Sequence, residues 1–153
     1  MAPTEDKVAP EESEHNFGDG VDRNTFDQIL EMDEEGDHDF SSSIVFGFFE
    51  QAQETFKSMD EALEEEELEK LSQLGHFLKG SSATLGLVKV RDGCEKIQRY
   101  GKNENEDGTA EPDSKVCLKR ITQALEVVKA DYKVVEKALR EFYEGKKDKS
   151  DEA

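Results

Sequence analysis

Apolar residues recur with the spacing of α-helices along most of this chain. One run follows residue 40, and its apolar positions fall on one side of a helix: Val45, Phe48, Phe49, Ala52, Phe56, Met59 and Leu63. A second run follows residue 114 and is close to a heptad repeat: Cys117, Leu118, Ile121, Ala124, Leu125, Val128, Tyr132, Val135, Ala138, Leu139 and Phe142. A long helix with one apolar side is typical of a helix bundle, so both runs predict an all-α protein that packs within one molecule as a monomer.

Shorter patterns predict three further helices. They cover residues 22–32, residues 66–84, and a segment that starts at Leu87 and turns Val90, Cys94 and Ile97 inward. We expect Ser41 to be the N-cap of the helix after Phe40, with Phe40 and Val45 as a hydrophobic staple, and Asp113 or Ser114 to cap the last helix. Residues 101–113 form a loop. Four long helices with short connections predict an antiparallel four-helix bundle, and the short first helix covers one end.

The charge of the chain is uneven, and this divides it into three parts. The 153 residues carry a formal net charge of −18, and residues 1–39 hold 14 Asp and Glu against 2 Lys and Arg. Residues 1–20 contain two prolines and no periodicity, so we expect a disordered acidic arm. Residues 21–145 form the predicted bundle domain, and residues 146–153 form a charged tail. Residues 33–39 resemble a calcium loop only superficially, because the glycine and the terminal glutamate are misplaced, and we interpret them as an acidic linker.

Composition also excludes some functions. The excess of acidic residues argues against nucleic acid and against anionic membrane surfaces, both of which bind Lys and Arg. No run of 18 apolar residues is present, and the first residues lack the features of a signal peptide. Cys94 and Cys117 form no C-x-x-C motif and fall on apolar sides of helices, which indicates buried, reduced thiols in an intracellular protein.

His76 is the strongest candidate for chemistry. It projects roughly 180° from the apolar side formed by Leu71, Leu74, Leu78 and Leu85. Gly80 lies one turn later on the same outward face, and Lys79 flanks it. The imidazole therefore stands on a solvent-facing side of the helix, beside a residue without a side chain and within reach of a cation.

Three interpretations of His76 compete. An exposed histidine can have no role at all. A metal ligand is disfavoured because Glu-x-x-His would need a glutamate where Gln73 stands, and because no second histidine lies four residues away. A nucleophile that accepts and passes on a phosphoryl group fits the setting, since a neutral imidazole can attack and Lys79 can offset the charge of the phosphoryl oxygens.

The residues around His76 carry a family resemblance. The string His76-Phe77-Leu78-Lys79-Gly80-Ser81-Ser82-Ala83-Thr84-Leu85-Gly86-Leu87, followed by Cys94-Glu95-Lys96-Ile97-Gln98, resembles histidine phosphotransfer (HPt) proteins. The likeness is greatest to the free-standing, yeast-type intermediates of fungal multistep phosphorelays. It continues upstream through Met32-Asp33, Asp39-Phe40-Ser41 and Glu50-Gln51-Ala52-Gln53, so that it covers most of residues 22–101.

The resemblance implies a function and a set of site residues. His76 would take a phosphoryl group from a receiver-domain aspartate of a hybrid sensor histidine kinase and give it to the receiver domains of response regulators. It implies that Gln98 hydrogen-bonds the active imidazole, whereas from spacing alone Gln98 could equally be an ordinary polar residue at the edge of the core. It also implies that Ile29, Met32, Phe40 and Ile44 form an apolar patch for receiver docking, although each could equally be a core residue.

The chain itself has no ATP-binding or kinase motif, so it is expected to be a phosphohistidine carrier and not an enzyme with its own kinase activity. No cofactor or metal of its own is expected, because the Mg²⁺ would be bound by the partner receiver domain. We expect the protein in the cytoplasm and also in the nucleus. The alternative hypothesis is a non-catalytic helical adaptor that binds a partner through the apolar patch without gaining phosphate.

Overall fold

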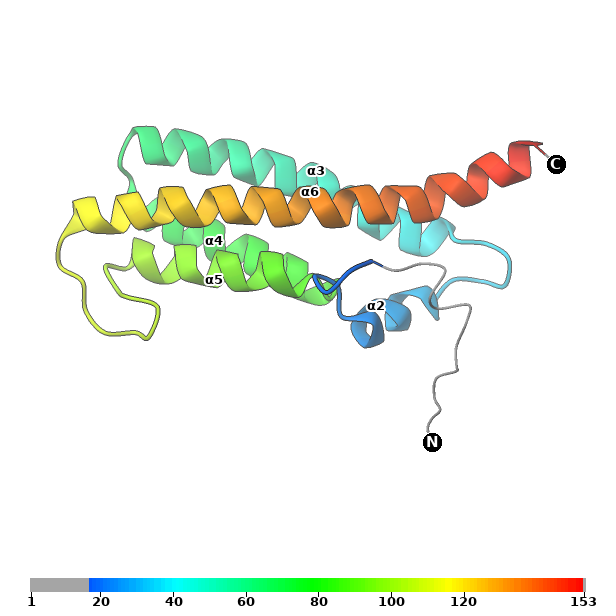
Figure 1. The fold of residues 1–153 in the computed structure, drawn as a ribbon, viewed down its shortest axis with the longest axis horizontal. Helices are drawn as coiled ribbons and strands as arrows, with labels where there is room; N and C mark the ends of the chain where they lie inside the picture. Colours follow the sequence, from blue (N-terminus) through cyan, green and yellow to red (C-terminus); the bar gives the residue numbers. More distant parts are fainter. Residues whose placement is uncertain (1–16, 153) are drawn as a thin grey trace.

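The computed structural model describes residues 17–152, and their side chains as far as residue 144. Helices dominate this part of the chain, and no strand longer than an isolated bridge occurs in it. The helices, labelled as in Figure 1, are α2 (Arg23–Leu30), α3 (Asp39–Glu64), α4 (Leu68–Thr84), α5 (Val88–Gly101) and α6 (Ser114–Glu152). The prediction of an all-α protein is confirmed.

Helices α3 to α6 form an antiparallel four-helix bundle (Figure 1). Each of these helices packs against the next one along the chain, and α6 returns to pack against α3. The apolar sides predicted for α3 and α6 form the core, where Val45, Phe49 and Met59 of α3 and Ile121, Val128 and Leu139 of α6 are buried. Helix α2 lies across one end of the bundle, as predicted, and buries Phe26 and Ile29.

Glycines allow a close contact between α4 and α5. A Cβ atom on Gly101 would lie 2.7 Å from the carbonyl oxygen of Leu68 and 2.7 Å from the amide nitrogen of Ser72. The tight turn predicted at Leu85-Gly86 is present, and Gly86 has a φ of 78°, which favours glycine. The Gly86 carbonyl accepts a hydrogen bond from the Asp22 amide at 2.7 Å, so the turn is also tied to the start of α2.

The N-terminal boundary of the domain lies earlier than predicted. Residues 1–16 of the expected disordered arm lie outside the described residues, but residues 17–20 are packed against the bundle. The Phe17 side chain is 3% exposed and meets the rings of Phe26 and Phe142 edge-on, with centroids 5.3 and 5.6 Å apart. The Gly20 carbonyl accepts a hydrogen bond from the Val88 amide at 3.0 Å. Aromatic burial therefore orders a segment whose composition predicted disorder.

The helical domain is also longer than predicted at its C-terminal end. Helix α6 continues to Glu152, whereas the predicted domain ends at residue 145 and is followed by a charged tail. A charged composition is compatible with a helix, and the Lys and Glu residues of this segment are good helix formers.

The predicted cap of α3 is wrong. The helix begins at Asp39, so Ser41 lies inside its first turn and is fully buried. The Ser41 amide is instead capped by a residue eight positions earlier in the chain, since it donates a hydrogen bond to the carboxylate of Asp33 at 2.8 Å. Phe40 is inside the helix and 45% exposed, which also removes the proposed staple with Val45. Part of the acidic linker is thus the capping element of α3.

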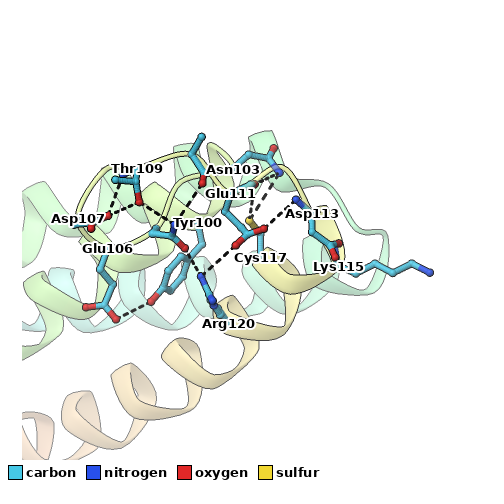
Figure 2. A network of polar contacts seen from close by, with 12 residues as sticks. Tyr100, Asn103, Glu106, Asp107, Thr109, Glu111, Asp113, Lys115, Cys117 and Arg120 are labelled. Carbon is cyan, nitrogen blue, oxygen red and sulfur yellow. Dashed lines mark hydrogen bonds and ion pairs between the residues drawn. The ribbon is translucent and has the colours of Figure 1, made fainter.

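The loop between α5 and α6 is held by polar contacts (Figure 2). Tyr100 donates to the carboxylate of Glu106 at 2.9 Å, and Arg120 contacts both Asn105 and Glu111. At the start of α6 the Asp113 side chain accepts from the Lys115 amide at 3.0 Å, so the predicted cap at Asp113 is confirmed. These contacts fix the end of α5, which lines the candidate site described below.

Both cysteines are free and buried, as predicted. Burial raises the pKa of the Cys94 thiol to about 12, so this thiol stays protonated near neutral pH. In the described part of the chain, no helix has the length and apolarity needed to cross a membrane.

Candidate functional site

His76 lies in the middle of α4 with its side chain exposed, as the spacing predicted. Among the described residues, none forms a hydrogen bond or an ion pair with its ring. Nor do any three described His, Cys, Asp or Glu side chains cluster closely enough to hold a metal ion. The imidazole is therefore directed at solvent, where another molecule can reach it.

The backbone behind His76 is fixed by Gly75. A Cβ atom on Gly75 would lie 2.8 Å from the carbonyl oxygen of Cys94 and 3.0 Å from the amide nitrogen of Gln98, both on α5. Leu71 and Leu78, one turn to either side, are fully buried. The inner face of α4 thus seats directly on the backbone of α5, and this contact sets the orientation in which His76 points outward.

The same contact brings Gln98 to the neighbourhood of His76. Gln98 is partly buried, and together with residues of α4 and the α5–α6 loop it lines a groove of about 130 Å³. This polar groove is formed by Lys79, Glu95, Gln98, Arg99, Lys102 and Glu104. His76 and Gln98 both lie beside the close contact between Gly75 and α5. Among the described residues, no hydrogen bond joins their side chains.

Charged side chains of both signs line the polar groove. The Lys79 ammonium lies 3.9 Å from a carboxylate oxygen of Glu95, whose other oxygen accepts from Arg99 at 3.2 Å. Arg99 also lies 3.5 Å from Glu104. Lys79 is held at the side of α4 near His76 by a long, partly exposed ion pair, which is weak enough for Lys79 to exchange partners.

Gly80 leaves the surface beyond His76 open. No described atom lies within 4 Å of where its Cβ would be, apart from its own helix. A glycine inside a helix costs about 1 kcal/mol relative to alanine, and nothing in the packing offsets that cost here. The bare backbone at this position leaves the surface beside His76 open, and no described neighbour outside the helix requires a glycine there.

Apolar side chains are exposed after the end of α2, at the start of α3 and on α4. Met32 is 68% exposed, Phe40 45% and Phe77 49%. Ile44 is partly buried and lines a groove of about 360 Å³ between α3 and α4, with Gly47, Phe48, Ser81 and Thr84 among its other residues. We call Met32, Phe40, Ile44 and Phe77 the apolar face.

One of the sequence-based assignments for this face needs correction, and two residues were missed. The resemblance implies that Ile29 belongs to the docking patch, with a core position as the equal alternative. Ile29 is 8% exposed and belongs to the core, because α2 turns it toward the bundle. Phe77 was given no role, although its position about 100° around the helix from His76 and off the buried side could have indicated exposure. Gly75 was also overlooked, since its close contact with α5 depends on tertiary packing.

The helix bundle with an exposed histidine on α4 matches a known protein family. The family model described as "Hpt domain" matches residues 44–139, so the chain belongs to the Hpt domain family.

Two fungal relatives share about half of their aligned residues with this chain. The chain is 49% identical over 125 residues to multistep phosphorelay regulator 1 of Schizosaccharomyces pombe, a match that covers 81% of this chain and 42% of that protein. It is 51% identical over 87 residues to phosphorelay intermediate protein YPD1 of Candida albicans, covering 57% of this chain and 47% of that protein. The chain thus spans less than half the length of these curated relatives.

Solved structures agree on the fold. The crystal structure of yeast Ypd1p is 30% identical and superimposes with a TM-score of 0.70, covering 82% of this chain and 95% of that chain. A co-crystal structure of Saccharomyces cerevisiae Ypd1 with the receiver domain of its downstream response regulator Ssk1 matches with a TM-score of 0.71, 30% identity, and the same coverage of 82% and 95%. The predicted four-helix bundle of HPt type is confirmed.

Proposed function

We propose that this protein is a histidine-containing phosphotransfer intermediate. His76 accepts a phosphoryl group from a receiver-domain aspartate of a hybrid sensor histidine kinase and passes it to the receiver aspartates of response regulators. The observation that carries the proposal is the exposed His76 ring beside the open surface at Gly80. The similarity to two fungal phosphorelay proteins supports it, as does the co-crystal of Ypd1 with a receiver domain.

The chemistry needs little from this chain beyond an aligned nucleophile. A lone pair of a neutral imidazole nitrogen attacks phosphorus, the bond between phosphorus and the aspartate oxygen breaks, and the receiver keeps the carboxylate. The second ring nitrogen carries the imidazole proton, and the reverse step hands the phosphoryl group to the next receiver. No ATP is needed, so the chain acts as a carrier, and the Mg²⁺ that stabilises the transferring group is expected on the receiver.

The neighbours of His76 have distinct proposed roles. Lys79 can leave Glu95 and offset charge on the phosphoryl oxygens, because their ion pair is long and partly exposed. Gly80 admits the phosphoaspartate and the backbone that carries it. Gln98, whose backbone amide lies beside Gly75, is the proposed hydrogen-bond partner of the imidazole.

The apolar face is the proposed docking surface for the receiver. Exposed apolar area anchors transient interfaces better than charge does, and Phe40 and Ile44 lie one helical turn apart on the same side of α3. Ile29 is left out because it is buried. The bundle is expected to act as a monomer, since the heptad pattern of α6 is used within the molecule.

The test is transfer of labelled phosphate from a purified, phosphorylated receiver domain. We expect the wild-type protein to gain an acid-labile phosphate and His76→Gln to gain none while keeping its far-ultraviolet circular dichroism spectrum. His15→Gln, in the segment before the described residues, serves as the matched control and should reach the wild-type stoichiometry. Retained label in His76→Gln would assign the site to another residue, and binding of the receiver without label in the wild type would favour the adaptor hypothesis.

A further inference from the structure

The connection between α2 and α3 contains a buried carboxylate. The Asp33 side chain is 3% exposed and accepts three hydrogen bonds. The donors are the Ser41 amide at 2.8 Å, the Ser41 hydroxyl at 2.6 Å and the Nδ1 atom of His38 at 2.9 Å. A carboxylate at this place also benefits from the positive end of the α3 dipole. The acidic linker is therefore closed onto α3 by one of its own side chains.

These hydrogen bonds continue into α6. The Tyr143 hydroxyl donates to the Ser41 hydroxyl oxygen at 2.8 Å, and the His38 ring meets the Tyr143 ring edge-on with centroids 6.2 Å apart. Burial raises the pKa of the Asp33 carboxyl, but the hydrogen bonds from Ser41 and His38 outweigh burial and leave that pKa below its usual value of 3.8. We call Asp33, His38, Ser41 and Tyr143 the junction network.

The junction network connects two exposed apolar residues. Met32 directly precedes Asp33, and Phe40 directly precedes Ser41, so the hydrogen bond between Asp33 and the Ser41 amide joins their neighbouring backbones. The Met32 amide also donates to the Ile29 carbonyl at 3.1 Å, which ties it to the end of α2. The backbones of Met32 and Phe40 are therefore held at fixed positions, while their side chains are 68% and 45% exposed.

We propose that Asp33 is a positioning residue for receiver docking, because it holds Met32 and Phe40 in the arrangement that the partner binds. This inference rests on the proposed phosphotransfer function. A partner that meets preorganised apolar side chains loses less freedom on binding than one that must order them. Asp33 does not touch the reacting atoms, so its effect belongs to docking and not to the reactivity of His76.

The test compares Asp33→Asn with Asp37→Asn. Both variants remove one negative charge from the same connection, and Asp37 is exposed and also caps a backbone amide, that of Asp39, at 2.9 Å. The measurement is the receiver concentration that gives half the maximal transfer rate in single-turnover reactions. We expect Asp33→Asn to raise this half-saturating receiver concentration about tenfold, and Asp37→Asn to leave it within about twofold of the wild-type value.

A small phosphodonor separates docking from chemistry. Phosphoramidate reacts with His76 without a docked protein, so its labelling rate should be the same in the wild type and in Asp33→Asn. In a Met32→Ala, Phe40→Ala background, Asp33→Asn should have little further effect on the half-saturating concentration, because the residues it positions are gone. An unchanged tenfold effect in that background, or slower labelling by phosphoramidate, would overturn the proposal.

The outcomes also distinguish this inference from the proposed function. A wild-type protein that takes label from phosphoramidate but none from any receiver would overturn the proposed function. A wild-type protein that takes label from the receiver, with equal behaviour of Asp33→Asn and Asp37→Asn, would overturn only the role of Asp33. If Asp33→Asn does not fold, Tyr143→Phe is the second variant, because it removes one hydrogen bond of the junction network. It should raise the half-saturating receiver concentration about threefold. No increase would count against the proposal.

Discussion

Two glycines five residues apart on α4 serve opposite purposes. At Gly75 an added Cβ would lie 2.8 Å from a backbone oxygen of α5, which cannot move without shifting that helix. At Gly80 the same atom would meet no described atom within 4 Å outside its own helix. The first glycine is required by packing on the inner face, and the second leaves space on the outer face. The residue type is the same, but only the structure separates the two roles.

The difference shows how a bundle helix presents a nucleophile. The inner face is packed so closely that α4 cannot rotate or slide, and this holds His76 in one direction. The outer face is kept bare around His76, so that a second protein can come close. Changes on the inner face should therefore appear in the free energy of unfolding, and changes on the outer face in the rate of phosphotransfer.

The largest effect is expected for Gly75→Ala. Its methyl group would press on the backbone at Cys94 and Gln98, and overpacking of this kind costs about 1–3 kcal/mol. We expect the free energy of unfolding to fall by about 2 kcal/mol, measured by urea denaturation. Gly80→Ala is the matched control and should raise stability by up to about 1 kcal/mol, because alanine favours helix at an open position. Equal effects of the two substitutions would show that the faces do not differ as described.

The second prediction concerns the outer face. Gly80→Gln places a long side chain where the phosphoaspartate must approach, so transfer from a receiver should slow about tenfold while stability is unchanged or slightly raised. The measurement is single-turnover transfer at saturating receiver. Ala130→Gln, an exposed change on α6, should leave the rate as in the wild type. A Gly80→Gln variant that transfers at the wild-type rate would remove the steric explanation for this glycine.

The sequence predicted those parts of the fold that depend on local pattern. The apolar sides of α3 and α6, the turn at Gly86 and the outward direction of His76 follow from helical spacing and from turn chemistry, and the structure has them. The packing of Phe17, the burial of Ile29 and the contact of Gly75 with α5 depend on residues distant in the chain. Helical spacing cannot supply such contacts, and the same is true of the cap that Asp33 gives to α3.

Charge patterning had a similar limit. An acidic run predicted a solvated linker, yet one of its carboxylates is buried because Ser41 and His38 donate hydrogen bonds to it. Nothing in the run itself distinguishes Asp33 from its acidic neighbours. A serine eight residues later, at the start of a helix, was the available indication, and it was interpreted as the cap and not as the capped residue.

The smallest effect is expected at the border between the two faces of α4. The Lys79 side chain is 28% exposed and lies 3.9 Å from Glu95, so the pair contributes little to stability, whereas the ammonium can neutralise part of the charge on an arriving phosphoryl group. Lys79→Ala should slow transfer about three- to fivefold, which is about 1 kcal/mol, and leave the denaturation midpoint nearly unchanged. Glu95→Gln removes the competing carboxylate and should leave the rate equal to the wild type or slightly faster. If Glu95→Gln slowed transfer as much as Lys79→Ala, the ion pair between Lys79 and Glu95 would be what transfer requires. Lys79 would then act by holding α4 against α5 and not by contacting the phosphoryl group.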